Sequence, residues 1–373
     1  MSGLFHDLAA PGVQNLQPYL PGKPVEELER ELGISDSIKL ASNENPLGAS
    51  AKALQAIRDC YTDIHYYPDG SAFKLGNRLA QKFDVDPACL TFGNGSNDVL
   101  ELVARAFLTP QHSAVYSQYA FAVYPIVVQA VGARANVAPA YAPHHQSMPL
   151  GHDPDALIDS IDDSTRVIFI ANPNNPTGTW MEPATIIAML DRIPANVIAV
   201  LDLAYLEYMD DALKPDIKSL LATYQNLVIT GTFSKVYALA GLRIGYGLSH
   251  PDIADLLNRV RQPFNTNLIA QAAALAALDD HEHLRQSVRL NEEGKAFLQQ
   301  AFGKLGLGYL PTMGNFISVD MQQDAGPVYD ALLHRGVIVR PVANYRMPNY
   351  LRMTIGTMEQ NRRLVDALTE VLA

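Results

Sequence analysis

Short apolar runs rich in β-branched residues alternate with amphipathic stretches of helical length up to about residue 250. Runs that are apolar along their whole length fit strands covered on both faces, and their alternation with helices predicts a largely parallel sheet flanked by helices. This is an α/β architecture. The predicted strands are residues 89–94, 113–117, 166–173, 197–205, 227–233 and 242–249, and two of the predicted helices are residues 96–108 and 182–193.

The pattern changes after about residue 250. A long helical region, residues 251–305, precedes three shorter strand-like stretches, residues 315–321, 336–342 and 350–356. This order predicts a smaller α+β domain at the C-terminus. The first 45 or so residues are rich in proline and glycine and are expected to form an arm. The predicted units are an N-terminal arm that joins the small domain, a large domain and a small C-terminal domain, at residues 1–45, 46–265 and 266–373.

The composition narrows the range of partners. The chain has 373 residues, of which 28 are Lys or Arg and 39 are Asp or Glu, and its formal net charge is −11. An acidic surface repels nucleic acid and anionic lipid, so neither is expected as a partner. Cys60 and Cys89 lie far apart without a CxxC motif, which fits a reducing compartment. No signal peptide or membrane-length apolar run is visible, so we expect a soluble cytoplasmic protein.

Ligands of open α/β sheets bind beyond the carboxyl ends of the strands, so the residues that follow each predicted strand are candidates. The sequence GNGSND (93–98) leads directly into a predicted helix. Ser96, Asn97 or Asp98 can cap that helix and leave free N–H groups for an anion such as phosphate, although an ordinary capped turn would look the same. A third glycine at the required spacing is missing, which argues against a dinucleotide-binding dehydrogenase.

Four further polar groups follow buried strands. Asn175, in NPNNPTGT (172–179), offers a fixed amide. Asp202 ends an apolar strand, where a carboxylate is costly to bury unless it is paired, so a ligand cation explains it better than a turn cap. Lys235 fits a surface loop by base rate, but burial would lower its pKa and make the amine nucleophilic enough to form a Schiff base. Arg243 offers a planar clamp for an anion.

Taken together, the strand ends supply a phosphate-binding helix start, an amide, a carboxylate, a phenol from Tyr205, an amine and a guanidinium. One ligand uses all of these groups. Pyridoxal 5′-phosphate needs N–H groups and an arginine for its phosphate, a carboxylate for its ring nitrogen, donors for its ring oxygen and a lysine for its aldehyde. The sequence therefore predicts this cofactor and no metal.

At this point the chain resembles the fold-type I, aspartate-aminotransferase-like enzymes, and more narrowly the histidinol-phosphate aminotransferases. NPNNPTG followed by Ser-Lys and a downstream LAGLR is specific for the superfamily. The N-terminal and C-terminal motifs indicate the subfamily. The shared motifs are KLASNENPLG (39–48), YYPDGS (66–71), GNGSND, YAFAVY (119–124), NPNNPTGT, FSKVYALAGLR (233–243), RVRQPFN (259–265), GNF (314–316), GVIVRPV (336–342) and LRMTIGT (351–357).

The resemblance implies roles for the cofactor site. Lys235 is expected to bind the aldehyde and to be the catalytic residue, and Asp202 to pair with the ring nitrogen. Asn175 and Tyr205 are expected to hold the ring oxygen, and Phe121 to stack on the ring. The residues expected at the phosphate are Gly95, Ser96, Asn97, Ser234 and Arg243.

The resemblance also implies a substrate side and a partner. Tyr67 is expected to reach the phosphate of the neighbouring subunit's cofactor, which implies a homodimer with shared active sites. Arg352 would bind the α-carboxylate of the substrate or the phosphate that replaces it, and Arg340 and Tyr19 are further candidate contacts. Without the family, Phe121 would be interpreted as a core aromatic and the two arginines as solvated charges.

The chain departs from the family at three points. Relatives usually read Asp-Glu-Ala-Tyr where this chain has Leu203 in the second position. Many relatives carry arginine where Gly231 stands, and Tyr237-Ala238 replaces a frequent Tyr-Gly. The missing carboxylate at position 203 bears on tuning and local packing more than on the type of reaction. The absence of arginine at position 231 removes a charge near the cofactor phosphate, and the third change is milder.

The implied reaction is transamination of histidinol phosphate with 2-oxoglutarate, an amino donor and a 2-oxo acid, to give imidazole acetol phosphate and glutamate. Phenylalanine or tyrosine is the nearest alternative donor, because phenyl and imidazole rings need similar apolar walls. A decarboxylase of amino-alcohol phosphates and a non-catalytic ligand sensor are more remote, since a sensor would usually carry an added domain. The histidines at 281–283 and 144–145 lack a third ligand at suitable spacing, so a metal hydrolase has little support.

Overall fold

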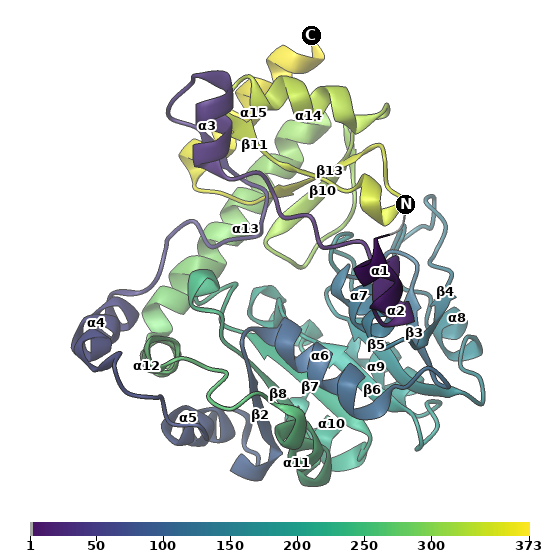
Figure 1. Ribbon diagram of the computed structural model, residues 1–373. Coiled ribbons are helices and arrows are strands. Elements are labelled where there is room, and N and C mark those ends of the chain that lie inside the picture. The colour runs from purple at the N-terminus through teal and green to yellow at the C-terminus, as the bar shows by residue number, and fades with distance from the viewer. Residues whose placement is uncertain (1–2) are drawn as a thin grey trace.

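The computed structural model describes residues 3–373, and the two larger of its sheets lie one above the other (Figure 1). The larger sheet contains, in spatial order, β2 (Leu90–Gly93), β8 (Gly245–Ser249), β7 (Leu227–Thr232), β6 (Ile198–Asp202), β5 (Thr165–Ala171), β3 (Ser113–Ser117) and β4 (Arg134–Ala138). Strand β8 is antiparallel to β2 and β7, and the pairs from β7 to β4 are parallel. The predicted largely parallel sheet is therefore confirmed.

The uniformly apolar strands are buried on both faces, as expected for a sheet between two helix layers. In β5, Ile168 and Ile170 pack into one hydrophobic cluster. Val167 and Phe169, which alternate with them, pack into a second cluster on the opposite face. Burial of both side-chain rows explains why the strand sequence has no polar alternation.

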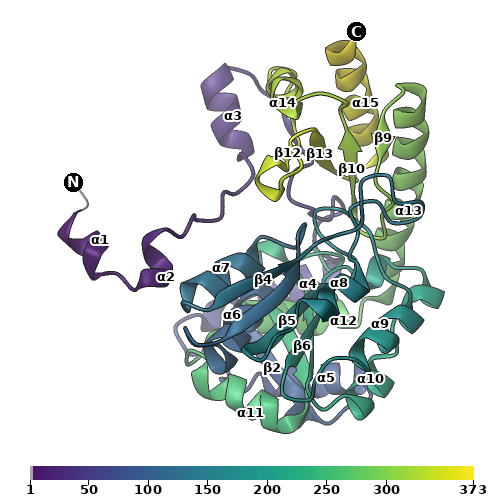
Figure 2. The ribbon, with the colours of Figure 1, turned by 90° about the vertical axis from the view of Figure 1, so that its right-hand side faces the viewer.

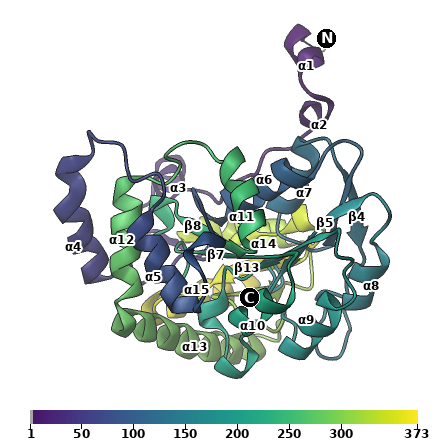
Figure 3. The same cartoon turned by 90° about the horizontal axis from the view of Figure 1, so that it is seen from below.

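Helices cover both faces of this sheet (Figure 3). One layer consists of α6 (Ser96–Phe107), α7 (Val123–Ala130) and α11 (Pro251–Val260), and the other of α8 (Pro154–Asp159), α9 (Pro183–Leu190) and α10 (Ile217–Thr223). Beside the sheet, α12 (Leu268–Leu278) packs against α4 (Ala51–Cys60) and α5 (Phe73–Phe83). Helix α12 follows residue 265 in the chain but packs with the large unit. The domain boundary near residue 265 stays a prediction.

The smaller unit has an antiparallel sheet in the order β12 (Arg340–Pro341), β13 (Tyr350–Thr354), β10 (Phe316–Asp320) and β9 (Gly308–Tyr309). Its helices are α13 (His281–Lys304), α14 (Ala325–Leu333) and α15 (Met358–Leu372). The N-terminal segment contributes α3 (Val25–Leu32) and β1 (Ile38–Lys39), and β1 pairs in parallel with β11 (Val337–Ile338). The residues just before position 45 therefore pack with the smaller unit.

Before α3 lie two short helices: α2 (Pro11–Gln14) packs against α7, and α1 (Leu4–Leu8) extends beyond it (Figure 2). Short 3-10 turns connect other elements, at η1 (Tyr61–Asp63), η2 (Pro87–Cys89), η3 (Leu206–Tyr208), η4 (Asp211–Leu213), η5 (Ala240–Leu242) and η6 (Ala343–Tyr345). Within residues 3–373, no helix has the length and apolar character needed to cross a membrane.

Candidate active site

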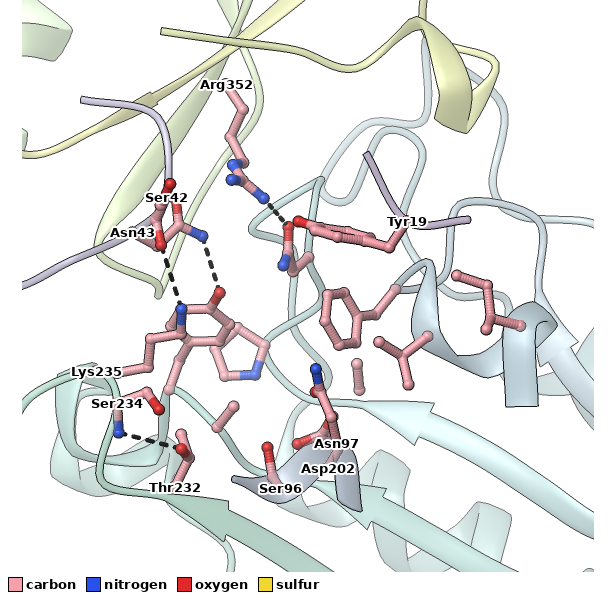
Figure 4. A pocket seen from close by; sticks show the side chains of 18 of the residues that line it. Tyr19, Ser42, Asn43, Ser96, Asn97, Asp202, Thr232, Ser234, Lys235 and Arg352 are labelled. Carbon is pink, nitrogen blue, oxygen red and sulfur yellow. Dashed lines mark hydrogen bonds between the residues drawn. The ribbon is translucent and has the colours of Figure 1, made fainter. Parts of the chain in front are cut away.

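A cavity of about 350 Å³ lies where β5, β6 and β7 end, facing the smaller sheet (Figure 4). Most of the residues expected at the site line this one cavity. They are Tyr19, Ser96, Asn97, Phe121, Asn175, Asp202, Tyr205, Ser234, Lys235, Arg243 and Arg352. Of the other expected residues, Gly95 precedes Ser96 of the lining. Tyr67 and Arg340 are not among the described residues that line the cavity.

Asp202 is the last residue of β6 and only 4% exposed. Its Oδ2 accepts a hydrogen bond from the Tyr124 hydroxyl at 2.9 Å, and its Oδ1 accepts one from the Thr230 hydroxyl at 3.0 Å. Burial raises the pKa of Asp202, while these donors and the charge of Lys235 act in the opposite direction. A ligand cation in the cavity would further stabilise the charged form of Asp202. The sequence predicts such a cation, the ring nitrogen of the ligand.

Lys235 follows β7 and points into the cavity (Figure 4). Its Nζ donates to the Ser42 carbonyl at 3.4 Å and lies 5.6 Å from the centre of the Tyr205 ring. Burial, assisted by the nearby charge of Arg352, lowers the pKa of Lys235 from 10.5 to about 8. A substantial fraction of the amine is therefore neutral near physiological pH. Lys235 lines the cavity, and its role as a nucleophile stays a prediction.

The start of α6 is capped differently from the expectation. Gly95, not Ser96, Asn97 or Asp98, is the N-cap residue; its φ is 87°, and no side chain caps the helix. The N–H groups of the first turn are therefore free of a side-chain cap and available to an anion. A Cβ at Gly95 would overlap the Arg243 guanidinium, so glycine allows this close approach. Arg243 also donates to the Ser234 hydroxyl at 3.3 Å.

The amide and phenol groups are held in place by partners on the opposite side of the cavity. Arg352 Nη1 donates to Asn175 Oδ1, which leaves the Asn175 NH₂ group as a donor. Asn43 Nδ2 donates to the Tyr205 hydroxyl at 2.8 Å, so the Tyr205 proton is free to be donated elsewhere. Both expected ring-oxygen donors are thus oriented with a donor to spare.

Arg340 and Arg352 lie directly opposite each other on the antiparallel strands β12 and β13. Arg352 is 4% exposed, donates to the Ala41 carbonyl at 2.7 Å, and has a buried Nε without a hydrogen-bond partner. Arg340 donates to the Leu20 carbonyl, and its guanidinium lies 5.6 Å from the centre of the Tyr19 ring. It lines a neighbouring cavity of about 280 Å³. Like charges facing each other across a ladder are destabilising, so a shared anion would relieve both.

Sequence reasoning missed several residues of the site. Tyr124 contacts Asp202, and Asn43 contacts Tyr205. Both lie in motifs, YAFAVY and KLASNENPLG, that the sequence analysis used only to identify the family. Nothing in those motifs marked either residue individually. Ser42 and Thr232 line the cavity, and Thr230 lies beneath it on β7. A period-two analysis of β7 places Thr230 and Thr232 on one face of the strand, which is the signal that could have found them.

The departures at Gly231 and Leu203 are explained by packing. A Cβ at Gly231 would overlap the ring of Tyr246, its cross-strand neighbour on β8. Leu203 is buried in the same hydrophobic cluster as Tyr246. In this chain the space beside both positions is filled by apolar and aromatic groups.

The cavity thus brings together a lysine with a lowered pKa, a buried carboxylate, two arginines and an uncapped helix start. The family model for aminotransferase class I and II matches residues 35–368. The chain is 56% identical to histidinol-phosphate aminotransferase 2 of Pseudomonas fluorescens, covering 100% of both chains, and 56% identical to that of Pseudomonas aeruginosa, covering 99% of both. Its structure matches that of histidinol-phosphate aminotransferase from Sinorhizobium meliloti in complex with pyridoxal-5′-phosphate. That match has a TM-score of 0.88 and 28% identity, and it covers 97% of this chain and 96% of the other.

The chain therefore belongs to the class I and II aminotransferases and, within them, to the histidinol-phosphate aminotransferase family.

Proposed function

We propose that this chain is a pyridoxal-phosphate-dependent aminotransferase that exchanges an amino group between histidinol phosphate and 2-oxoglutarate, giving imidazole acetol phosphate and glutamate. In histidine biosynthesis the same reaction runs in the opposite direction, with glutamate as the amino donor. The observation that carries the activity is the half-buried Lys235 amine, which shares one cavity with Asp202, Arg243 and Arg352. The full-length relatives support the choice of substrate.

The residues of the cavity fit pyridoxal 5′-phosphate. Lys235 would hold its aldehyde, Asp202 its ring nitrogen, and Asn175 and Tyr205 its ring oxygen. Phe121 would lie on the ring, and Gly95, Ser96, Asn97, Ser234 and Arg243 would hold the phosphate. When bound, the cofactor supplies an aldehyde that bonds to amines and a ring that accepts electrons. The uncapped start of α6 and the glycine beside Arg243 are the structural observations that favour a phosphate there.

The chain's own groups handle the protons of the reaction. The Lys235 amine would take the proton from the α-carbon of the amino donor as a general base and would then deliver it, as an acid, to the carbon that carries the cofactor's aldehyde. Its pKa of about 8 suits both tasks, since a catalytic acid–base group works best with a pKa near the working pH. Asp202, as a carboxylate, holds a proton on the ring nitrogen. The two half-reactions predict ping-pong kinetics.

The substrate side is proposed to recognise an anion. Arg352 would bind the α-carboxylate of glutamate or the phosphate of histidinol phosphate, with Arg340 and Tyr19 as further contacts. Their facing arrangement across β12 and β13 supports a ligand that carries negative charge. The apolar side chains of Phe121, Val123 and Ile126 line the same cavity and suit an aromatic ring.

The substrate proposal is tested by steady-state kinetics with pyridoxal phosphate and 2-oxoglutarate present. We expect kcat/KM for histidinol phosphate to exceed that for phenylalanine by about 100-fold or more, because binding of the phosphate adds charge-assisted hydrogen bonds. An equal or higher value for phenylalanine would favour the aromatic aminotransferase instead. Absence of a visible absorption band after incubation with the cofactor would contradict the whole class.

We also propose a homodimer in which Tyr67 reaches the cofactor phosphate of the neighbouring subunit. Tyr67 is 82% exposed and stacks on Phe264 with ring centres 4.7 Å apart. Ile64, Tyr66 and Phe73 are also exposed, and such a cluster of large apolar side chains favours a partner surface. Sedimentation velocity of the parent tests the dimer. A titration of the parent and of Tyr67→Phe with the cofactor tests the contact to its phosphate. A monomeric parent, or unchanged cofactor affinity in the variant, would contradict the proposal.

We further propose that the enzyme works in the cytoplasm. Cys60 and Cys89 are free thiols, which suits a reducing compartment. Fractionation of cells that produce the tagged chain tests the location, and recovery in another compartment would contradict it.

A further inference from the structure

We infer that Tyr124 is a positioning residue for transamination, because its hydroxyl donates to Asp202 and fixes the orientation and ionisation of that carboxylate. The inference rests on the proposed function, in which Asp202 is the partner of the cofactor's ring nitrogen. Nothing in the sequence pattern or the family resemblance assigned Tyr124 a role.

The hydroxyl of Tyr124 is a polar group in otherwise apolar surroundings. Tyr124 lies in the first turn of α7 and is fully buried. Its ring stacks on Phe169 of β5, with centres 5.0 Å apart and planes 12° from parallel. A phenylalanine would fill this space equally well, and a hydroxyl in an apolar core is costly unless it is hydrogen-bonded. The 2.9 Å bond to Asp202 Oδ2 is therefore the reason for a tyrosine here.

Asp202 needs this donor because burial alone would favour its neutral form. Tyr124 and Thr230 donate to different oxygens of the carboxylate, and a hydrogen bond from the Ala204 backbone N–H also favours the charged form. Burial and the adjacent carboxylate hold the pKa of Tyr124 well above its usual value of 10. The phenol therefore remains a donor over the whole working pH range.

Tyr124 also reaches the aromatic residue proposed to lie on the cofactor ring. Its ring meets Phe121 edge-on, with centres 5.9 Å apart and planes at 89°. The first turn of α7 thus joins two proposed cofactor contacts, a carboxylate and a ring face. The Tyr124 side chain thus contacts both Asp202 and Phe121.

The test compares Tyr124→Phe with the parent holoenzyme. We expect kcat to fall about 10- to 100-fold with KM values within about twofold, the loss typical of one hydrogen bond to a charged group. Titration of the apoprotein with pyridoxal 5′-phosphate should show an affinity about tenfold lower. Tyr116→Phe is the matched control, because Tyr116 is a buried tyrosine of β3 outside the proposed machinery, and it should keep both values within about twofold.

A second variant separates donation from packing. Tyr124→His is smaller than tyrosine but can donate a hydrogen bond, so it should be faster than Tyr124→Phe if donation matters and slower if the role is structural. Parent-like kcat and cofactor affinity in Tyr124→Phe, or failure of that variant to fold, would overturn the inference. If the parent itself does not transaminate histidinol phosphate, the proposed substrate fails, and the cofactor titration still decides the role of Tyr124.

Discussion

The two walls of the cavity are built differently. On the wall formed by the large sheet, buried side chains fix one another, as Tyr124 and Thr230 do for Asp202. On the wall formed by the arm and the small sheet, Tyr19 is 45% exposed, and Arg340, which lies outside the lining itself, donates to a backbone carbonyl and faces the Tyr19 ring.

This difference matches the two functions proposed for the walls, cofactor binding and substrate binding. A resident cofactor benefits from a rigid, preorganised wall, because its position must be right at every turnover. Two substrates of different shape must take turns at the other wall, and a loosely held side can adapt to both. Arg352 lies between these cases, since it is buried on the small sheet but donates to Asn175 of the large unit.

The largest effect is expected at the rigid wall, in Lys235→Ala. Loss of the amine removes both the covalent anchor and the general base, so kcat should fall at least about 1000-fold. The absorption band of the lysine-bound cofactor should also disappear and no cofactor should remain attached after borohydride reduction. Lys304→Ala, at the exposed end of α13, is the control and should behave like the parent. Retention of a borohydride-reducible band in Lys235→Ala would rule out this residue as the anchor.

The comparison of the walls is tested directly by two arginine variants. Arg352→Gln should lower kcat/KM for histidinol phosphate about 100-fold, because a buried charge-assisted contact is lost. Arg340→Gln should lower it only about tenfold or less, since Arg340, although buried, lies outside the lining of the main cavity. Arg346→Gln, an exposed arginine after η6, serves as the control. An equal or larger loss in Arg340→Gln would break the proposed distinction.

The pH dependence of cofactor uptake tests the perturbed amine. The pKa of Lys235 in the folded protein is about 8, below its ordinary value of 10.5, so the neutral amine gains about tenfold per pH unit up to pH 8 and then levels off. The rate at which apoprotein develops the visible band, measured by stopped flow, should follow that curve. A rate that keeps rising to pH 10 would show an unperturbed lysine.

The same shift affects stability, with a definite sign. Between pH 8 and 10.5 the unfolded chain binds more protons on this amine than the folded chain does, so the apoprotein should gain stability as the pH rises through this window. Lys235→Met should remove this pH dependence in chemical denaturation experiments.

The smallest effect concerns packing beneath the rigid wall. Gly231→Ala should lower the free energy of unfolding by about 1–3 kcal/mol, because the new methyl group meets the Tyr246 ring. Gly303→Ala is the matched control: Gly303 lies in α13 with nothing within 4 Å of an added Cβ, so alanine should stabilise by about 0.5–1 kcal/mol. Urea unfolding measures both. A neutral Gly231→Ala would contradict the packing explanation.

The rigid wall was largely predictable from the sequence and the loose wall was not. Asn175, Asp202 and Lys235 each follow an apolar strand, and parallel strands bring their carboxyl ends to one edge, so the pattern itself assembles them. The sequence also predicts both sheets, because uniformly apolar strands separated by helices leave few other arrangements.

Other features depend on contacts between distant segments. Asn43 meets Tyr205 across 162 positions and Tyr124 meets Asp202 across 78. A tyrosine within an apolar helix has the same pattern whether its hydroxyl is bonded or free, so periodicity cannot assign it. The helix cap at Gly95 was missed because serine is the commoner cap, while the close approach of Arg243 requires the glycine.

The segment from Ile38 to Asn43 joins the two walls mechanically. It pairs with β11 through β1, and the Thr354 backbone N–H of the small sheet donates to the Leu40 carbonyl. Its far end carries the Ser42 carbonyl and the Asn43 amide, which contact Lys235 and Tyr205. One short segment thus bonds both to the smaller unit and to two polar groups of the cavity, so its position depends on both units.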